Sequence, residues 1–330
     1  MMLKISIIML SALILAPDAE AICTLARGVP TPLAIPSQII RIAADAPVDT
    51  SLPIAQFDSP TPGQNIGYDD CLAGTEYGKR TLNLIGQNAA TKIFQTNIPG
   101  IGIKLLASNG SAFGNFPSTA GIVFPGGQST GTFDYPGQSF YRIQFFKTGD
   151  NLRLSNPMGD TVLPPGQIAY SYLMTADPAS FVMNLTIGEI KIISTPACTA
   201  DSAKTVDFND VTPSLLKNGV TRNLNFTIVC KSDYGSYSAK ASIITATPSS
   251  DASYIRAKDA AGNQDRLGIK ITDSAGKAMK VDGSTSEQKT SITSRGPAEF
   301  SWNATLVASS QSAPTGGILS AKAEIVFDIQ

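Results

Sequence analysis

Long stretches of this chain alternate between apolar and polar residues, and no other feature limits its fold as strongly. One such stretch places Phe300, Trp302 and Ala304 around Ser301 and Asn303. A period of two puts successive side chains on opposite faces of a β-strand, so one face can be buried while the other meets solvent. No segment shows the period of an amphipathic helix of ordinary length, and 28 Gly and 21 Pro supply turns for many short strands. The sequence therefore predicts an all-β protein.

The length of 330 residues suggests two domains, because one domain typically takes about 150 residues. Residues 194–197 follow the strand-like stretch 183–193 and precede Cys198, where a new alternating pattern begins. We place the domain boundary there. The predicted organisation is an N-terminal domain over residues 22–193, a linker over 194–197 and a C-terminal domain over 198–330.

The first 21 residues have the layout of a secretory signal peptide. A short start with one positive charge, Lys4, precedes an apolar run over residues 5–16, and Ala19-Glu20-Ala21 provides a small-x-small cleavage site. A membrane anchor would need about 20 apolar residues, and Pro17 ends the run before that length. We expect cleavage after Ala21, export of residues 22–330, and no membrane span in the exported part.

Export makes disulfides possible, so the four cysteines bear on the fold. They are Cys23, Cys71, Cys198 and Cys230, and four cysteines allow three pairings. Sequential pairing, Cys23 with Cys71 and Cys198 with Cys230, puts one bridge on each side of the predicted boundary, and we expect that arrangement. The alternative, four buried free thiols, is less favourable in an exported protein.

Composition argues against several classes of function. The chain has no histidine, so it has no Ser-His-Asp or Cys-His catalytic arrangement and no zinc site with a histidine ligand. The formal net charge is −1, which leaves no basic excess to bind a nucleic-acid backbone. Asp69, Asp70 and Glu189 could form the acid pair of a glycosidase, but isolated acids in β proteins are usually solvated turn residues. We expect no enzymatic activity, no cofactor and no metal.

The C-terminal half resembles the pilin domain of chaperone–usher fimbriae. The resemblance spans most of residues 198–330, and its elements follow the order of the family. The chain departs from the family at the penultimate position, where Ile329 replaces the usual Tyr. The residues that carry the resemblance are Cys198-Thr199, Val206-Asp207-Phe208, Leu224-Asn225-Phe226-Thr227-Ile228-Val229-Cys230, Leu267-Gly268-Ile269-Lys270-Ile271, Asp273-Ser274-Ala275-Gly276, Phe300-Ser301-Trp302-Asn303-Ala304 and Gly317.

A whole domain precedes this pilin-like half, and that layout resembles a two-domain fimbrial tip adhesin. The resemblance implies that the C-terminal domain is an immunoglobulin-like sandwich that lacks its last strand and is completed by a donor strand. It also implies an N-terminal β-sandwich that binds a host glycan or a matrix protein. The implied partners are a periplasmic chaperone, the outer-membrane usher and the next fimbrial subunit. The implied location is the fimbrium tip at the cell surface, reached through the periplasm.

Residues 319–330 alternate up to the C-terminus, and the simplest interpretation is one core strand. The resemblance adds that this strand borders the open slot and contacts the chaperone, which anchors the C-terminal carboxylate. The expected interface residues are Leu319, Ala321, Ala323, Ile325, Phe327, Ile329 and Gln330.

A receptor site is expected near the first disulfide. Asp69, Asp70, Glu76 and Tyr77 flank Cys71, and carboxylates beside an aromatic ring suit the hydroxyls and ring of a sugar. The other interpretation is a polar turn around a structural disulfide. The mannose pocket of a related adhesin is not transferred, because the expected N-terminus lies one residue before the first cysteine instead of two. The alternative function is a structural or adaptor fimbrial subunit without receptor binding.

Overall fold

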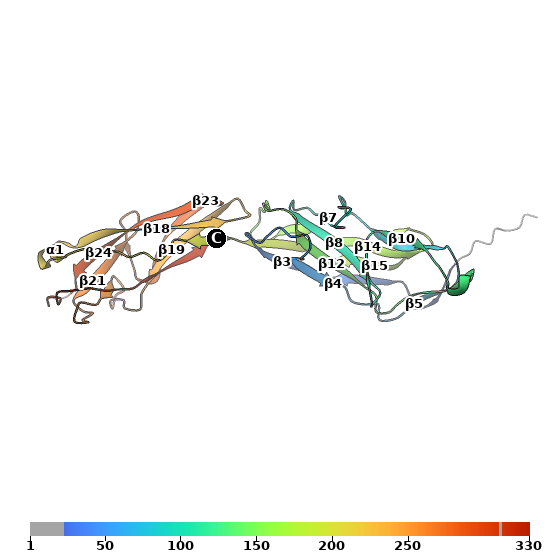
Figure 1. Cartoon of the computed structure of the whole chain (residues 1–330), viewed down its shortest axis with the longest axis horizontal. Coiled ribbons are helices and arrows are strands. Elements are labelled where there is room, and N and C mark those ends of the chain that lie inside the picture. The colour runs from blue at the N-terminus through green and yellow to red at the C-terminus, as the bar shows by residue number, and fades with distance from the viewer. Residues whose placement is uncertain (1–22, 310–311) are drawn as a thin grey trace, which may run out of the picture.

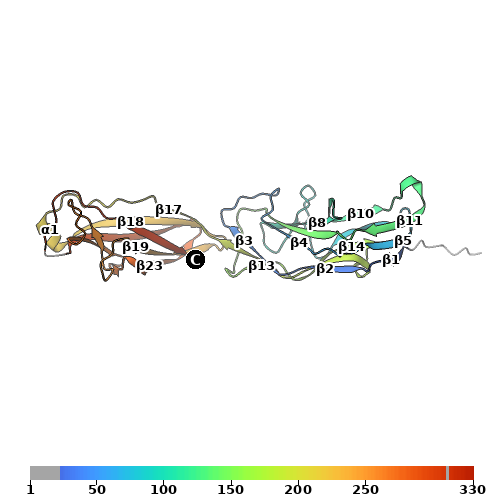
Figure 2. The ribbon, with the colours of Figure 1, turned by 90° about the horizontal axis from the view of Figure 1, so that it is seen from below.

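The structure is a computed structural model that describes residues 23–309 and 312–330. It forms two elongated lobes joined end to end, the N-terminal one blue to yellow-green and the C-terminal one yellow to red (Figures 1 and 2). Strands dominate both lobes, and within the described ranges the helical elements are α1 (Pro213–Asn218) and two 3-10 turns. The all-β prediction is confirmed. The predicted signal peptide, residues 1–21, lies outside the described residues.

The N-terminal lobe consists of short strands separated by turns, because Gly, Pro, Asn and Asp recur between its apolar runs. Its strands are β1 (Thr24–Arg27), β2 (Thr31–Ile35), β3 (Gln38–Ala43), β4 (Ala55–Asp58), β5 (Ile66–Leu72), β6 (Glu76–Thr81), β7 (Phe94–Gln95), β8 (Ile101–Ser108), β9 (Phe113–Asn115), β10 (Ser118–Gly121), β11 (Thr130–Tyr135), β12 (Phe140–Lys147), β13 (Asp160–Leu163), β14 (Gly166–Leu173), β15 (Phe181–Ile187) and β16 (Ile190–Thr195).

These strands surround one hydrophobic cluster. Their sheets have the orders β1-β5-β11, β10-β6-β14-β15-β2, β4-β12-β8-β7 and β13-β16-β3, with β9 paired to β8. Strands β2 and β3 run parallel to β15 and β16, so the first and last segments of the lobe lie side by side. Tyr141 is buried in the cluster, and its hydroxyl contacts the Ser171 hydroxyl at 2.7 Å and donates to the Met183 carbonyl at 3.0 Å. These bonds satisfy the polar group that the core encloses.

The C-terminal lobe has longer strands, and two of them come from the alternating stretches that contain Phe226 and Trp302. The period-two pattern predicted both. The strands of this lobe are β17 (Ala197–Ala200), β18 (Val220–Lys231), β19 (Ser236–Ile244), β20 (Ile255–Ala257), β21 (Leu267–Thr272), β22 (Ala278–Met279), β23 (Asp282–Thr293), β24 (Pro297–Ala308) and β25 (Glu324–Ile329).

Two sheets face each other across a second hydrophobic cluster. One has the order β17-β18-β24-β21-β20, with β22 paired to β21, and the other has the order β23-β19-β25. Phe226 stacks on Phe300 with ring centroids 5.1 Å apart and meets Trp302 edge-on at 4.8 Å. The Trp302 indole N–H donates to Glu287 Oε2 at 2.7 Å, so the largest buried side chain of the lobe leaves no unpaired donor.

Both sequential disulfides are present, one in each lobe. Cys23 is bonded to Cys71, which ties the segment before β1 to β5. Cys198 on β17 is bonded to Cys230, its partner across the ladder on β18. No free cysteine remains among the described residues. Each bridge constrains the unfolded chain of its own lobe.

The expectation of one continuous strand over residues 319–330 is wrong. Only Glu324–Ile329 form a strand, β25, and it pairs with β19. Ser320 instead exchanges two backbone hydrogen bonds with Lys258, of 2.8 and 3.0 Å, which holds residues 319–323 near the other sheet. The chain therefore crosses between the sheets before β25 begins. The alternation of apolar and polar residues continues through residues 319–323, although these residues form no strand.

The two lobes meet through polar contacts. Strand β16 ends at Thr195 and β17 begins at Ala197, so most of the predicted linker is strand. Across the junction, Ser194 Oγ donates to Asp233 Oδ2 at 2.6 Å, and both residues are buried. At the rim, Asp150 pairs with Lys231 at 2.8 Å and with Arg295 at 3.3 Å. We propose that the lobes are two domains, because each has a hydrophobic cluster of its own.

Replacing Ser194 by Ala tests this junction. The change leaves the buried Asp233 carboxylate without its hydroxyl donor, and such an unsatisfied buried group costs about 1–3 kcal/mol. We expect the free energy of unfolding of S194A to fall by that amount in chemical denaturation. T195A, at the exposed neighbouring position, is the control and should stay within about 0.5 kcal/mol of wild type. Equal stability of S194A and T195A would contradict the role of this bond.

Candidate functional site

A hollow of about 1270 Å³ opens on the C-terminal lobe. One wall is the end of β17 and the segment that follows it, within residues 200–208. The other wall is the segment that leads into β25 and the first part of β25 itself, within residues 319–327. The floor consists of core side chains from both sheets, which are Leu224, Phe226, Ile243, Ile255, Ile269, Ile271 and Ala304. We call this hollow the groove. It is an apolar floor between two chain segments, which is the shape of a missing strand.

The groove is open because, among the described residues, no further strand lies beyond β17 or β25 at the edges of their sheets. Strand β17 ends at Ala200, and residues 201–212 form no strand. Strand β25 lies at the edge of its sheet, since its only strand partner among the described residues is β19. The C-terminus lies at the junction end of this lobe, and α1 lies at the far end (Figure 1).

The backbone of β25 presents unpaired groups to the groove. Gln330 and Ser238 exchange both backbone hydrogen bonds, of 2.7 and 3.0 Å, so they are a hydrogen-bonded pair of the antiparallel ladder. Such pairs alternate along the ladder. The register therefore turns the N–H and C=O groups of Ile325, Phe327 and Ile329 away from β19. These groups form the free edge that an additional strand would need.

The side chains of the same three residues point into the core but remain only half-buried. Phe327 meets Phe226 and Phe300 with ring centroids 5.9 and 6.0 Å apart, whereas Val326 is exposed on the outer face. The core of the lobe thus reaches the edge of the molecule at β25 without a cover. An unpaired edge above exposed apolar side chains is a surface that favours pairing with another chain.

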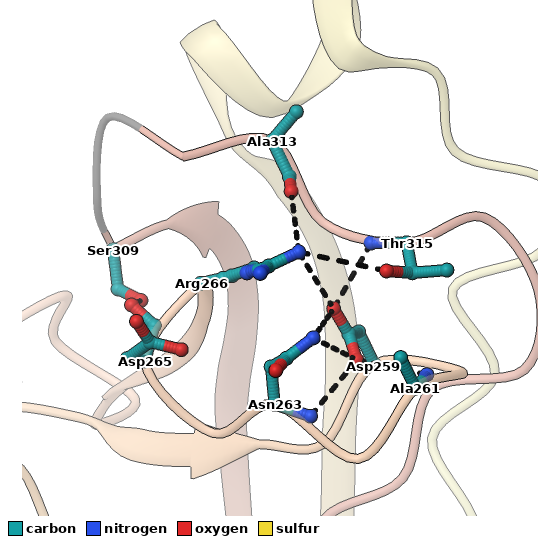
Figure 3. Close-up of polar contacts among 8 residues, drawn as sticks. All are labelled: Asp259, Ala261, Asn263, Asp265, Arg266, Ser309, Ala313 and Thr315. Atoms are coloured by element: carbon teal, nitrogen blue, oxygen red, sulfur yellow. Dashed lines mark hydrogen bonds and ion pairs between the residues drawn. The ribbon is translucent and has the colours of Figure 1, made fainter.

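The wall that leads into β25 is anchored by one buried carboxylate, shown in Figure 3. The Asp259 side chain is fully buried and accepts hydrogen bonds from the backbone N–H of Thr315 at 2.9 Å and from the side-chain amide of Asn263. Arg266 Nη1 lies 3.8 Å from the same carboxylate and donates to the Ala313 carbonyl at 3.1 Å. These bonds hold the pKa of Asp259 well below its ordinary value, with the Thr315 N–H as the largest cause.

Gly317 lets this wall lie close to the loop that contains Asp259. Its φ of +131° is unfavourable for other residues, and a Cβ at this position would lie 2.7 Å from the Cβ of Ala260. The sequence pattern did not predict the Asp259 anchor. The Asp, Gly and Asn residues of the loop 259–263 signal a turn, but nothing local indicates that the turn binds residues more than 50 positions further along.

Three of the four residues expected to bind a receptor, Asp69, Glu76 and Tyr77, have partners inside the N-terminal lobe. Asp69 forms an ion pair with Arg27 at 3.1 Å, and Arg27 also pairs with Asp134. Asp70 is exposed on β5, with a φ of +58°. The hydrogen bonds that Arg27 donates to Asp134 and Asp69 raise the pKa of Arg27, which therefore keeps its charge.

Glu76 and Tyr77 begin β6, in a different sheet from β5. Glu76 accepts a hydrogen bond of 2.6 Å from the Tyr172 hydroxyl. The Tyr77 ring packs on Phe133 with centroids 4.7 Å apart and adjoins the core. The four residues thus divide between two sheets, and binding by them stays a prediction.

No group of three or more Cys, Asp and Glu side chains in the described ranges is placed to hold a metal ion. Over the same residues, no helix is long and apolar enough to cross a membrane.

Comparison with known families identifies the part of the chain that contains the groove. Residues 184–330 match the family model of fimbrial proteins. The match therefore includes the whole C-terminal lobe. The match covers slightly less than half of the sequence and excludes most of the N-terminal lobe. No curated protein matches the sequence.

Several solved structures resemble the chain at low identity. The receptor-binding domain of the plasmid-born adhesin MrkD1P of Klebsiella pneumoniae is 18% identical, with a TM-score of 0.40, and 56% of this chain covers 98% of it. The CsuC–CsuE chaperone–tip adhesion subunit complex of Acinetobacter baumannii gives 10% identity, a TM-score of 0.40, and coverage of 90% and 99%. The CupB6 tip adhesin of Pseudomonas aeruginosa gives 11% identity, a TM-score of 0.36, and coverage of 92% and 94%. At these scores the similarities support no functional conclusion.

Replacing Asp259 by Asn tests the anchor of the groove wall. An amide would place its N–H₂ group against N–H donors, so we expect D259N to unfold at a lower temperature than wild type at pH 7. The folded protein holds the Asp259 pKa below its ordinary value of 3.8, so this stabilisation is present above about pH 4 and is lost as the pH falls toward the folded pKa. The difference between the two melting temperatures should therefore shrink between pH 5 and pH 2.5.

The control for this measurement is D265N, because Asp265 is an exposed carboxylate of the same connection. D265N should have the same melting temperature as wild type at pH 7. A gap between wild type and D259N that does not change on acidification would contradict the anchoring role of the charged carboxylate.

Proposed function

We propose that this chain is a fimbrial tip adhesin whose C-terminal lobe is completed by a strand from another protein. The single observation that carries the proposal is the free edge of β25 above a groove of core side chains. The match of residues 184–330 to the fimbrial family supports it independently. In this proposal the lobe is an immunoglobulin-like sandwich that lacks one strand.

A donor strand would bind by two sets of contacts. Its backbone would pair with the outward N–H and C=O groups of Ile325, Phe327 and Ile329, which supplies affinity for any extended chain. Its alternate side chains would fill the groove and contact floor residues such as Phe226 and Ile271. Each large apolar side chain buried in this way contributes about 1.5–3 kcal/mol.

The proposed partners follow from this requirement. A subunit with an open groove needs a temporary strand during export and a permanent one in the fibre. We assign the first role to a periplasmic chaperone and the second to the next fimbrial subunit, with assembly at the outer-membrane usher. Two disulfides are compatible with passage through the oxidising periplasm to the cell surface.

The N-terminal lobe would then be the part that contacts the host. It has a complete core of its own, and it stands where an ordinary fibre subunit carries only a donor segment. We propose that it binds a host glycan or a matrix protein. A structural or adaptor subunit without a receptor is the competing function, and receptor binding by the full chain separates the two.

Fusing a donor strand to the chain tests the incomplete sandwich. An alternating apolar segment is attached after Gln330 through a flexible linker long enough to enter the groove from either end. Burial of several apolar side chains should raise the melting temperature of the C-terminal lobe by about 10 °C or more. The matched control carries the same extension with its apolar residues replaced by Asp, and it should melt with wild type.

Two variants of β25 test whether the fused strand stabilises the lobe by binding in the groove. Phe327→Asp points a charge into the core and should abolish the gain from the fused strand, whereas Val326→Asp, on the exposed face of the same strand, should keep it. Wild type that is already as stable as the fusion would contradict the proposal of an incomplete sandwich.

A further inference from the structure

The outer face of the sheet that contains β12 carries a cluster of aromatic and polar side chains in the N-terminal lobe. Tyr141 and Ile143 on β12 point into the core, so their neighbours Phe140, Arg142 and Gln144 face outward. Strand β4 lies beside β12 in this sheet and places Asp58 opposite Arg142. On the other side, β8 and β9 bring Phe113 next to this row.

An arginine that is bound at two points lies at the centre of the cluster. Arg142 donates from Nε and from Nη2 to the two carboxylate oxygens of Asp58, both at 2.7 Å. Its guanidinium lies 4.5 Å from the centroid of the Phe113 ring and 5.7 Å from that of Phe140. The ion pair and the rings together fix the guanidinium, so the cluster is preorganised before any ligand arrives.

Phe113 remains substantially open to solvent. Its ring meets Phe140 edge-on with centroids 5.6 Å apart and contacts Arg142, yet 47% of the residue is exposed. The face of an aromatic ring carries partial negative charge and attracts the weakly positive C–H groups that line one face of a pyranose ring. A half-exposed ring held by two neighbours is therefore a stacking surface for a sugar.

The polar groups beside Phe113 keep unused hydrogen-bonding capacity of both kinds. Arg142 has five N–H donors and uses two of them on Asp58, whose carboxylate can accept further bonds. Gln144 donates to Gln56 at 2.9 Å, which leaves a carbonyl on Gln144 and donors on Gln56. Donors and acceptors in alternation match sugar hydroxyls, which both donate and accept.

The charges of this face favour a neutral ligand at the ring. Arg142 and Asp58 neutralise each other directly beside Phe113. Two further cations lie nearby: Lys104, which β8 places opposite Gln144 on β12, and Lys79, whose ammonium lies beside Gly114 of β9.

We propose that this face, formed by Phe113, Phe140, Arg142, Asp58 and the Gln56–Gln144 pair, binds a pyranose residue of a neutral glycan, with the sugar ring stacked on Phe113. The proposal rests on the proposed adhesin function and gives it a site, which lies apart from Asp69, Asp70, Glu76 and Tyr77.

The test measures binding of the purified full chain to an array of neutral and acidic oligosaccharides, and to immobilised matrix proteins including collagen. We expect wild type to bind neutral glycans, F113A to lose at least about tenfold in affinity, and F113W to retain binding because it restores the stacking surface. Val123→Ala is the control, since Val123 is also a strongly exposed apolar residue of this lobe and lies outside the proposed site.

The possible results distinguish failure of the proposed sugar site from failure of the proposed adhesin function. Glycan binding that is equal in wild type and F113A overturns the site and leaves the adhesin function intact. Binding to acidic glycans alone, or to a matrix protein alone, overturns the neutral sugar and again leaves that function intact. Binding of wild type to neither surface overturns the adhesin function and this site together.

Discussion

The unpaired edge of β25 is the constraint on which the C-terminal lobe depends. The strand turns three apolar side chains toward the core and the backbone groups of the same residues toward open space. One element therefore leaves both a row of main-chain donors and acceptors and a row of core side chains unfinished. Water can hydrogen-bond to the main-chain groups, but it does not stabilise the exposed apolar side chains. A strand that pairs with the edge and fills the groove therefore replaces the hydrogen bonds to water and also buries the apolar side chains.

The rest of the lobe keeps the groove formed while it is empty. The Cys198–Cys230 bridge fixes the short strand beside one wall, and the buried Asp259 carboxylate holds the chain that leads into the other. Between them, Phe226 of the groove floor packs against Phe300 and Trp302. In the N-terminal lobe, β2 pairs with β15 and β3 pairs with β16 in parallel, which joins the first and last strands of the lobe around one core.

The sequence predicted the strands that have a regular local pattern, but it did not predict the features that depend on contacts between distant residues. Alternation identified β18 and β24, because a period of two is enough to define a strand with one buried face. It failed at residues 319–323, where the same alternation continues but Ser320 bonds to Lys258 at the other sheet. Proximity to Cys71 likewise suggested a receptor site, but it gave no sign of Tyr172 or Phe133, which engage Glu76 and Tyr77. The Phe113–Arg142–Asp58 cluster joins three strands and has no local signature.

Hydrogen exchange at β25 tests the central claim most directly. The amides of Ile325, Phe327 and Ile329 point away from β19, whereas those of Val326 and Asp328 belong to hydrogen-bonded pairs of the ladder. In the chain without a donor strand, the first set should exchange much faster than the second, and a donor strand should slow the first set while leaving the second nearly unchanged. Slow exchange of Ile325, Phe327 and Ile329 without any donor, or exchange that a donor strand does not change, would contradict the open edge and the function built on it.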